Sequence, residues 1–170
     1  KPWVLSALDL KTAASDASAM SARAPVTSLT GSVRIEPLDP ALGAEGGLKF
    51  DGGLVNARPG PWVDRHVPVR TLKVDLRGRA RAAGPLDLPN FEAVLSDGRR
   101  DAGVLRASGH WDADRFEVKA DLEQVRPSAV DPSLPAMTLT GPIAASGSWP
   151  VAAGGTRAAI PAFQATARLN

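Results

Sequence analysis

Two histidines are the obvious candidates for acid-base chemistry near neutral pH, and neither has suitable neighbours. His66 and His110 lie in different predicted strands, and neither belongs to an H-E-x-x-H motif. In that motif two imidazoles on one helix face hold zinc. We therefore expect structural or surface roles for both histidines.

Nucleophilic catalysis has no recognisable motif either. No serine lies in a G-x-S-x-G elbow, and the sequence contains no cysteine. The absence of cysteine removes thiol catalysis, thiolate metal ligands and disulfide bonds. We expect a non-enzymatic protein without a cofactor or a metal. A carboxylate pair for glycoside hydrolysis stays open at this stage, because only the fold would bring two such groups together.

Four aspartates are the candidates for calcium ligands, but their spacing favours turns. They are Asp97, Asp101, Asp112 and Asp114. The EF-hand spacing and its terminal glutamate are missing. The glycine-rich segments 45–47 and 51–53 lack the phosphate-cradle pattern and its lysine, so we interpret them as strand ends and kinks.

The charge balance argues against a nucleic-acid partner. The chain has 20 Lys and Arg against 18 Asp and Glu, with the two signs interspersed. Aromatic residues make up only 5%, too few for base-stacking platforms. Arg77, Arg79 and Arg81 would share one face of a strand, and we interpret this stripe as solvated, with anionic head groups as the alternative.

Strict alternation of apolar and polar residues is the strongest pattern in the sequence, and it is typical of half-buried strands. The clearest windows are residues 29–36, 115–123, 137–149 and 163–169. Weaker predicted strands are residues 3–10, 48–56, 67–79, 91–95 and 104–111. In the long central strand the apolar phase switches between Val69 and Leu72, which predicts a bulge.

Turn chemistry separates these strands. Hairpin turns are predicted at residues 97–98, 112–114 and 153–155, and loops at residues 58–61 and 83–89. The alanine-rich residues 12–24 fit either a helix or an irregular linker.

These patterns predict an all-β protein: an elongated, curved antiparallel or mixed sheet that forms an apolar groove, with little helix. Residues 1–170 are long enough for one unit, and we expect that unit to be a fragment of a larger protein. No apolar run is long enough to span a bilayer. A closed sandwich, with the apolar faces of two sheets packed together, is the structural alternative.

A faint internal repeat favours an array of similar units. Residues 7–10 followed by residues 29–33 are echoed by residues 119–122 followed by residues 139–143. Possible repeat units are residues 1–60 and 100–170. Repeated strand-rich units stack side by side and bury their faces against their neighbours.

The segment 115–149 resembles a known family. An alternating strand ending in Asp121-Leu122 is followed by Val125-Arg126-Pro127-Ser128, then by Leu139-Thr140-Gly141 and a second alternating strand. This pattern is similar to the repeat of the TamB branch (translocation and assembly module subunit) of the AsmA-like superfamily of Gram-negative bacteria. The resemblance is strongest over about a third of the chain.

The resemblance implies a taco-shaped β-groove in the periplasm, within a protein anchored in the inner membrane outside this segment. It implies phospholipid transport between the inner and outer membranes, and assembly of outer-membrane proteins with a TamA-like barrel partner. The alternation itself selects the apolar residues that would line such a groove and contact acyl chains. They are Leu29, Val33, Ile35, Phe116, Val118, Leu122, Leu139, Ile143, Phe163 and Leu169.

Two other classes of function compete with lipid binding. A protein-binding scaffold would pair an open sheet edge with strands of an outer-membrane client or a barrel partner. A β-sandwich hydrolase or sugar-binding module would depend on the scattered carboxylates.

Overall fold

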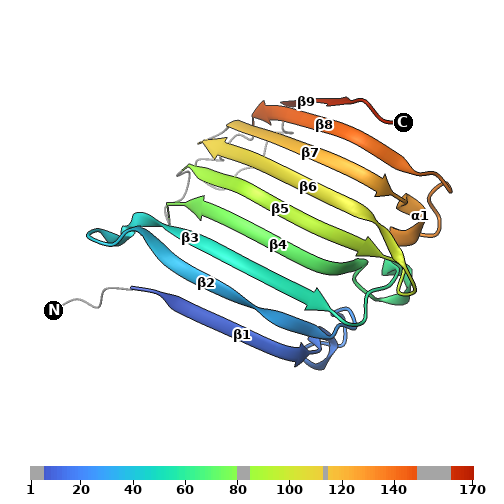
Figure 1. Ribbon diagram of the computed structural model, residues 1–170, viewed down its shortest axis with the longest axis horizontal. Helices are drawn as coiled ribbons and strands as arrows, with labels where there is room; N and C mark the ends of the chain where they lie inside the picture. Colours follow the sequence, from blue (N-terminus) through green and yellow to red (C-terminus); the bar gives the residue numbers. More distant parts are fainter. Residues whose placement is uncertain (1–5, 80–84, 113–114, 149–161) are drawn as a thin grey trace, which may run out of the picture.

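The chain folds into one antiparallel sheet of nine strands. The computed structural model describes residues 6–79, 85–112, 115–148 and 162–170. Within these ranges the strands follow one another in sequence order, each hydrogen-bonded to the next (Figure 1). The strands are β1 (Leu8–Ser15), β2 (Leu29–Asp39), β3 (Gly43–Asn56), β4 (Val69–Gly78), β5 (Leu86–Ser96), β6 (Asp101–Asp112), β7 (Arg115–Val125), β8 (Leu139–Ser148) and β9 (Ala162–Ala167).

Helical structure is confined to short turns between strands. These turns are η1 (Ala17–Ala19), η2 (Trp62–Asp64) and α1 (Pro127–Val130). The prediction of an all-β antiparallel fold with little helix is confirmed. The closed-sandwich alternative is wrong for the described residues, whose named strands all belong to the one open sheet.

The register of the strands joins their alternating apolar residues into continuous rows, because cross-strand partners share a face of the sheet. One row crosses all nine strands as Leu10, Val33, Gly52, Val74, Phe91, Ala107, Ala120, Ile143 and Ala167. A neighbouring row runs through Thr12, Gly31, Leu54, Leu72, Ala93, Leu105, Leu122 and Gly141. We call the side of the sheet with these rows the apolar face, and the other side the polar face.

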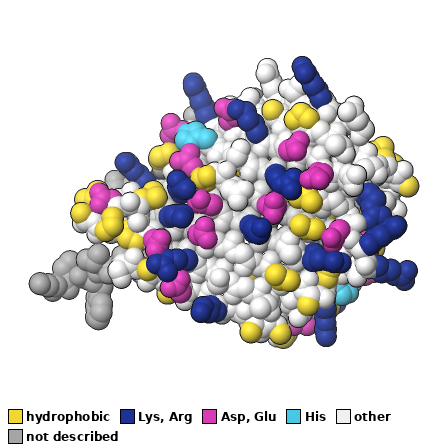
Figure 2. Space-filling view, in the orientation of Figure 1, with side chains coloured by type: hydrophobic (Ala, Val, Ile, Leu, Met, Phe, Trp, Pro, Cys, Tyr) yellow, Lys and Arg dark blue, Asp and Glu magenta, His cyan; other side chains and the backbone are white. Residues whose placement is uncertain are grey.

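Ion pairs between strands cover the polar face. Glu92 on β5 lies between Lys73 of β4 (3.3 Å) and Arg106 of β6 (3.0 Å), and Arg106 also pairs with Glu123 of β7 at 2.8 Å. Hydrogen bonds from Arg106 and Lys73 lower the pKa of the Glu92 carboxyl. Basic and acidic side chains are interspersed over the face seen in Figure 2. Such exposed pairs each add little stability, so they chiefly keep this face solvated.

The three arginines of the predicted stripe differ in their surroundings. Arg77 pairs with Asp75 on its own strand at 3.0 Å, and Arg79 lies just beyond the end of β4. Arg81 falls outside the described residues.

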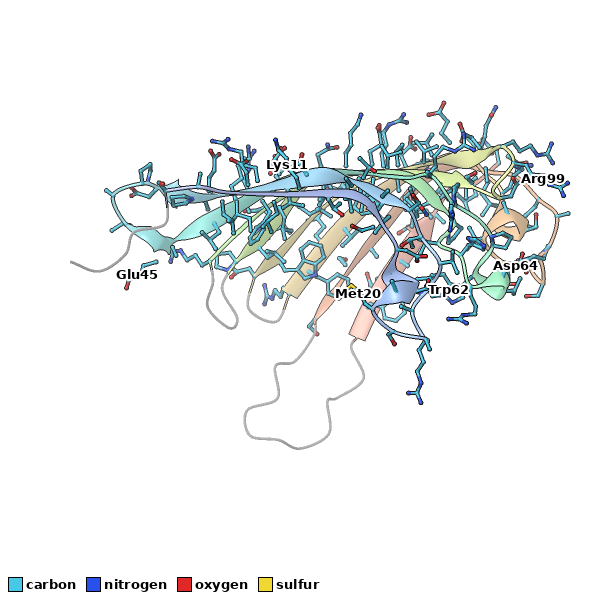
Figure 3. The ribbon with its side chains drawn as sticks, turned by 90° about the horizontal axis from the view of Figure 1, so that it is seen from below. Lys11, Met20, Glu45, Trp62, Asp64 and Arg99 are labelled. Atoms are coloured by element: carbon cyan, nitrogen blue, oxygen red, sulfur yellow. The ribbon has the colours of Figure 1, made fainter. Side chains whose placement is uncertain are left out.

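Buried side chains concentrate at the end of the sheet that carries η1, η2 and α1. Ala93, Ala102, Leu122, Val125 and Ala129 are less than a tenth exposed, and α1 contacts β5. Met20 and Trp62, in the turns at this end, lie on the opposite side of the sheet from Lys11 (Figure 3). Lys11 belongs to the polar face through its partner Ser32, so these turns lie on the apolar side.

Two predictions about local structure need correction. Residues 12–24 form neither a helix nor a wholly irregular linker, because β1 runs to Ser15 and only η1 follows, capped by the Asp16 carboxylate. The predicted loop 83–89 ends earlier, since β5 begins at Leu86. Pro89 is accommodated in β5 at a register shift between Leu88 and Phe91, where a missing amide donor is tolerated.

Other local predictions agree with the structure. The phase switch in the long central strand coincides with a register shift between Val69 and Thr71. The Asp97-Gly98 turn joins β5 to β6, with Gly98 at φ 94°. Strands β6 and β7 pair antiparallel, with Asp112 opposite Arg115. Residues 113–114 of the turn predicted at 112–114 lie outside the described ranges, and so does the turn predicted at 153–155.

The two glycine-rich segments of β3 differ in how they fit the prediction of strand ends and kinks. Residues 45–47 lie at a register shift between β2 and β3, and Gly47 has φ 109°, so a kink is confirmed there. Residues 51–53 lie inside the strand and pair regularly on both sides, so the prediction is wrong for them. Gly52 faces Val33, and a Cβ at Gly52 would lie 3.1 Å from Val33 Cγ2. The glycine therefore leaves room for a larger residue on the neighbouring strand.

The predicted repeat corresponds to two corners with the same geometry. At each corner one residue with left-handed backbone, Ala14 (φ 50°) or Gln124 (φ 51°), donates its amide to a threonine hydroxyl on the next strand. The acceptors are Thr30 and Thr140, and a short helical turn follows each corner. The sequence match aligns Leu10 with Leu122, but the structure gives a different equivalence. Thr12 pairs with Gly31 on the next strand, and Leu122 pairs with Gly141, so Thr12 is the residue equivalent to Leu122.

Candidate functional site: the apolar face

The ten residues selected from the sequence lie on one side of the sheet. Leu29, Val33 and Ile35 alternate along β2, and Phe116, Val118 and Leu122 along β7. Leu139 and Ile143 alternate along β8, and Phe163 on β9 pairs with Gly147. The register of the intervening strands places all of these on the apolar face.

Leu169 lies beyond the end of β9 but keeps the same pairing. The amide of Arg168 donates to the Pro142 carbonyl, and Thr140 and Asn170 exchange backbone hydrogen bonds. This ladder places Leu169 opposite Gly141 and thus on the apolar face. Its side chain is 38% exposed.

The four central strands contribute apolar residues that the sequence did not select. They include Phe50, Leu54, Leu72, Val74, Leu76, Phe91 and Leu105. The alternation in β3 is interrupted by glycines, and in β4 and β5 by register shifts. Only the pairing across strands assigns these residues to the apolar face, and that pairing is known only from the structure.

Large apolar side chains remain accessible over much of the apolar face. Leu8 and Leu10 on β1 are about half exposed, and Phe163 on β9 is 64% exposed. Val33, Ile35 and most of the others are half-buried, while Leu122 is buried. A partly accessible apolar surface that crosses so many strands is unusual for a monomeric soluble protein, which makes this face the candidate site.

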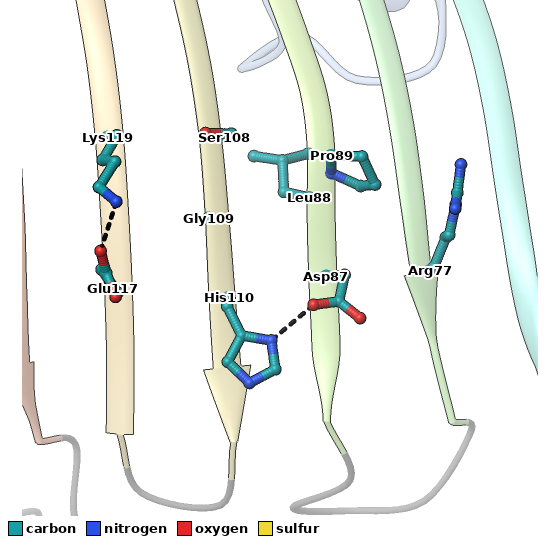
Figure 4. A pocket seen from close by; sticks show the side chains of 9 residues that line it. All are labelled: Arg77, Asp87, Leu88, Pro89, Ser108, Gly109, His110, Glu117 and Lys119. Carbon is teal, nitrogen blue, oxygen red and sulfur yellow. Dashed lines mark hydrogen bonds and ion pairs between the residues drawn. The ribbon is translucent and has the colours of Figure 1, made fainter.

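A polar hollow on the opposite face is the alternative place for chemistry (Figure 4). His110 Nδ1 lies 2.5 Å from Asp87 Oδ1, and Lys119 Nζ lies 2.8 Å from Glu117 Oε1. The imidazole is turned toward Asp87, whereas Ser108 lies further along the strand, so its hydroxyl receives no general base from His110 in this arrangement (Figure 4). Both members of the His110–Asp87 pair are about half exposed, which fits a hydrogen bond at the surface.

The second histidine belongs to a different part of the molecule. His66 lies after η2, and its Nδ1 is 3.1 Å from the carbonyl oxygen of Arg58. The two histidines therefore do not converge, and the contact of His66 holds a loop.

The aspartates considered as calcium ligands are separated or already bonded. Asp97 Oδ1 accepts the amides of Arg99 and Arg100, and these hydrogen bonds lower the pKa of the Asp97 carboxyl. Asp101 pairs with Arg70 at 3.2 Å, and Asp112 lies at the other end of β6. Asp114 is outside the described residues. Within the described ranges no cluster of three or more potential ligands could hold a metal ion.

Comparison with protein-family models, curated proteins and solved structures finds no match to this chain. Among the described residues, no helix has the length and apolar composition needed to cross a membrane.

Proposed function

We propose that this protein is a non-enzymatic segment that shelters the acyl chains of phospholipids on its apolar face. The observation that carries the proposal is the apolar row that crosses all nine strands, with large side chains still accessible at both edges. Hydrocarbon is the ligand chemistry that fits Leu, Val, Ile, Phe and Ala side chains.

The balance of forces suits transport better than tight binding. Each methylene removed from water contributes about 0.8 kcal/mol, so even part of an acyl chain would be held. The two rows that define the apolar face contain one polar side chain, Thr12, so a chain could slide along the rows without breaking specific polar contacts. Weak selectivity among lipids follows from this.

The cellular setting of the proposal comes from the resemblance to the TamB branch. On that basis the protein works in the periplasm, as part of a protein anchored in the inner membrane, and moves phospholipid between the two membranes. A TamA-like barrel and outer-membrane protein clients are the proposed protein partners.

Photo-crosslinking with a lipid that carries a diazirine on its acyl chain tests the proposal. Ile143→Asp puts a carboxylate on the apolar face of β8, and Val118→Glu does so on β7. We expect either change to reduce crosslinking at least several-fold. The matched control is Ala144→Asp, which adds the same group one residue along β8, on the polar face opposite Lys119.

Two results would count against lipid binding. One is native mass spectrometry of gently purified protein without any bound lipid. The other is equal crosslinking of Ile143→Asp, Val118→Glu and Ala144→Asp, because the apolar face would then have no part in the contact.

Pairing of a sheet edge with a client strand is the second candidate function. Within the described sheet, β1 and β9 each have one neighbour, so each presents backbone groups on its other side. Along a strand, the amides of successive residues point alternately to the two sides. The Arg168 amide points toward β8, so the amide of Ala165, an odd number of residues away, points away from the sheet.

A proline substitution separates this second function from lipid binding. Ala165→Pro removes an outward donor while leaving the pairing with β8 intact. It should abolish capture of an unfolded outer-membrane protein and leave the lipid content unchanged, whereas Ala165→Thr retains the amide and should capture normally. Normal capture by Ala165→Pro would argue against strand pairing at this edge.

A further inference from the structure

A cavity of about 210 Å³ lies at the end of the apolar face that is closed by loops. Leu29, Leu54 and Leu72 form its floor on β2, β3 and β4, and they are part of the apolar face. Val67 and Val69 line it from the segment that enters β4. The cavity is therefore continuous with the apolar face.

The loops around the cavity are held by a buried hydrogen-bond network. Asn56, 4% exposed, accepts the amides of Ser28 and Arg58 on its Oδ1 at 3.1 Å and donates from Nδ2 to the Val67 carbonyl. Thr27, 2% exposed, accepts the Ala17 amide at 2.9 Å. A backbone bridge between Val26 and His66 joins the two loops.

These bonds leave the cavity without polar side-chain groups in need of a partner. Both buried polar side chains of the wall are fully engaged with the loops, and the described residues include no buried side-chain nitrogen or oxygen without a hydrogen bond. Arg70, which also borders the cavity, is bonded to Ser96 and Asp101. An occupant with polar groups would gain nothing here and would lose its hydration.

We propose that this cavity is a terminal subsite that takes the methyl end of a saturated alkyl chain lying on the apolar face. The proposal rests on the proposed function, because the rest of the chain lies along the rows of the apolar face. The cavity volume of about 210 Å³ leaves room for a short terminal length of alkyl chain and not for a whole acyl chain.

A subsite bounded at one end by loops makes binding depend on chain length. Affinity rises about fourfold with each added methylene while the cavity is being filled. Beyond that length, extra methylenes meet the loop wall or stay in water, and the rise ends. An open face without such an end would show a gradual increase over the whole series.

Titration of the purified protein with saturated alkyl chains tests the subsite. The probes are free fatty acids from octanoic to stearic acid and phosphatidylglycerols with matched chains, each below its critical micelle concentration. Displacement of a fluorescent fatty acid reports affinity. We call the chain length at which affinity stops rising the break. A break at the same chain length in both series identifies the alkyl end as the recognised group, whichever molecule supplies it.

Two variants should shift the break in opposite directions. Val67→Phe fills part of the cavity, so we expect the break about three carbons earlier and roughly a sixtyfold loss for the longest chains. Leu54→Ala enlarges the cavity, so we expect the break about two carbons later. The control Val55→Phe adds the same bulk to the polar face of β3, between Thr30 and Thr71, and should leave the break in place.

The outcomes separate this subsite from the function on which it rests. If alkyl chains bind but neither Val67→Phe nor Leu54→Ala moves the break, the subsite is refuted and lipid binding stands. If wild-type protein binds no alkyl chain of any length, the proposed function fails and the subsite fails with it.

Discussion

Gly103 on β6 occupies a position that no other residue type fits. Its φ is +113°, and a Cβ there would lie 2.5 Å from Val125 Cα and 2.6 Å from the Gln124 carbonyl oxygen. Both neighbours are backbone atoms of β7, so they cannot move aside without disturbing the strand pairing. The close approach thus depends on the absence of a side chain.

We expect Gly103→Ala to lower the free energy of unfolding by about 3 kcal/mol, from steric overlap and a strained backbone together. Urea denaturation followed by circular dichroism measures the effect. Gly53→Ala is the matched control, because a Cβ at Gly53 would come no closer than 3.8 Å to Leu72 O. Equal stability of the two variants would show that β6 and β7 are less closely paired than the structure indicates.

Asp97 links the stability of the β5–β6 turn to pH. Hydrogen bonds from the amides of Arg100 and Arg99 lower the pKa of its carboxyl below the ordinary value of 3.8. A carboxyl whose pKa is lower in the folded state stabilises the fold above its unfolded pKa, and that contribution is lost as pH falls through the folded pKa. The affected window therefore begins near 3.8 and extends to more acidic pH.

Replacing Asp97 by asparagine should remove this pH dependence while keeping the side-chain oxygen that accepts both amides. We expect Asp97→Asn to be less stable than wild type at neutral pH, with the difference shrinking below about pH 4. Urea midpoints from about pH 7 to about pH 2 test this. A constant difference across that range would mean that Asp97 titrates as it does in the unfolded chain.

At the scale of elements, the two equivalent corners are the most specific local devices in the fold. Each combines a register shift, one left-handed residue and a threonine that accepts the freed amide: Ala14 with Thr30 at 3.0 Å, and Gln124 with Thr140 at 3.1 Å. The left-handed conformation is unfavourable for alanine and glutamine, so the threonine bond helps to hold it.

We expect Thr30→Val and Thr140→Val each to destabilise the fold by about 1 kcal/mol, because each leaves one amide without its acceptor. The corners involve different strand pairs, so the double variant should lose about the sum. Thr166→Val on the exposed strand β9 makes the same chemical change away from both corners and serves as the control. A loss in the control equal to that in the corner variants would show that the hydrogen bond is unimportant.

The elements differ in how far the sequence predicts them, and the reasons are physical. Strands β2, β7, β8 and β9 carry strict alternation, which has the period of the pleat, and their positions agree with the structure. Strand β1 extends through alanine-rich residues that favour a helix locally, and pairing with β2 decides its conformation. Local propensity cannot report a partner that lies many residues away.

The candidate site was predicted at its edges and missed in its centre. Residues such as Val33 and Ile143 follow from alternation within one strand. Phe50 and Leu72 follow only from the register across strands, since Gly52 interrupts the pattern in β3 and a register shift interrupts it in β4. The cavity depends on loops whose hydrogen bonds to Asn56 have no signature in the sequence.

At the scale of the whole molecule, the described residues form a single layer whose strands pair only with their neighbours in sequence. A sheet of this kind is stabilised along one dimension, so its parts need not be equally stable. The buried residues Ala93, Ala102 and Leu122 lie in β5, β6 and β7, where α1 covers one end of the apolar face.

We therefore expect amide hydrogen exchange to be slowest in β5, β6 and β7 and at least about tenfold faster in β1 and β9. The outer strands each bond to one neighbour and carry exposed side chains such as Leu10 and Phe163. Exchange measured by mass spectrometry at neutral pH resolves these segments. If β1, β6 and β9 exchange at one rate, the sheet opens as a single cooperative unit, and the nearest-neighbour account of its stability is wrong.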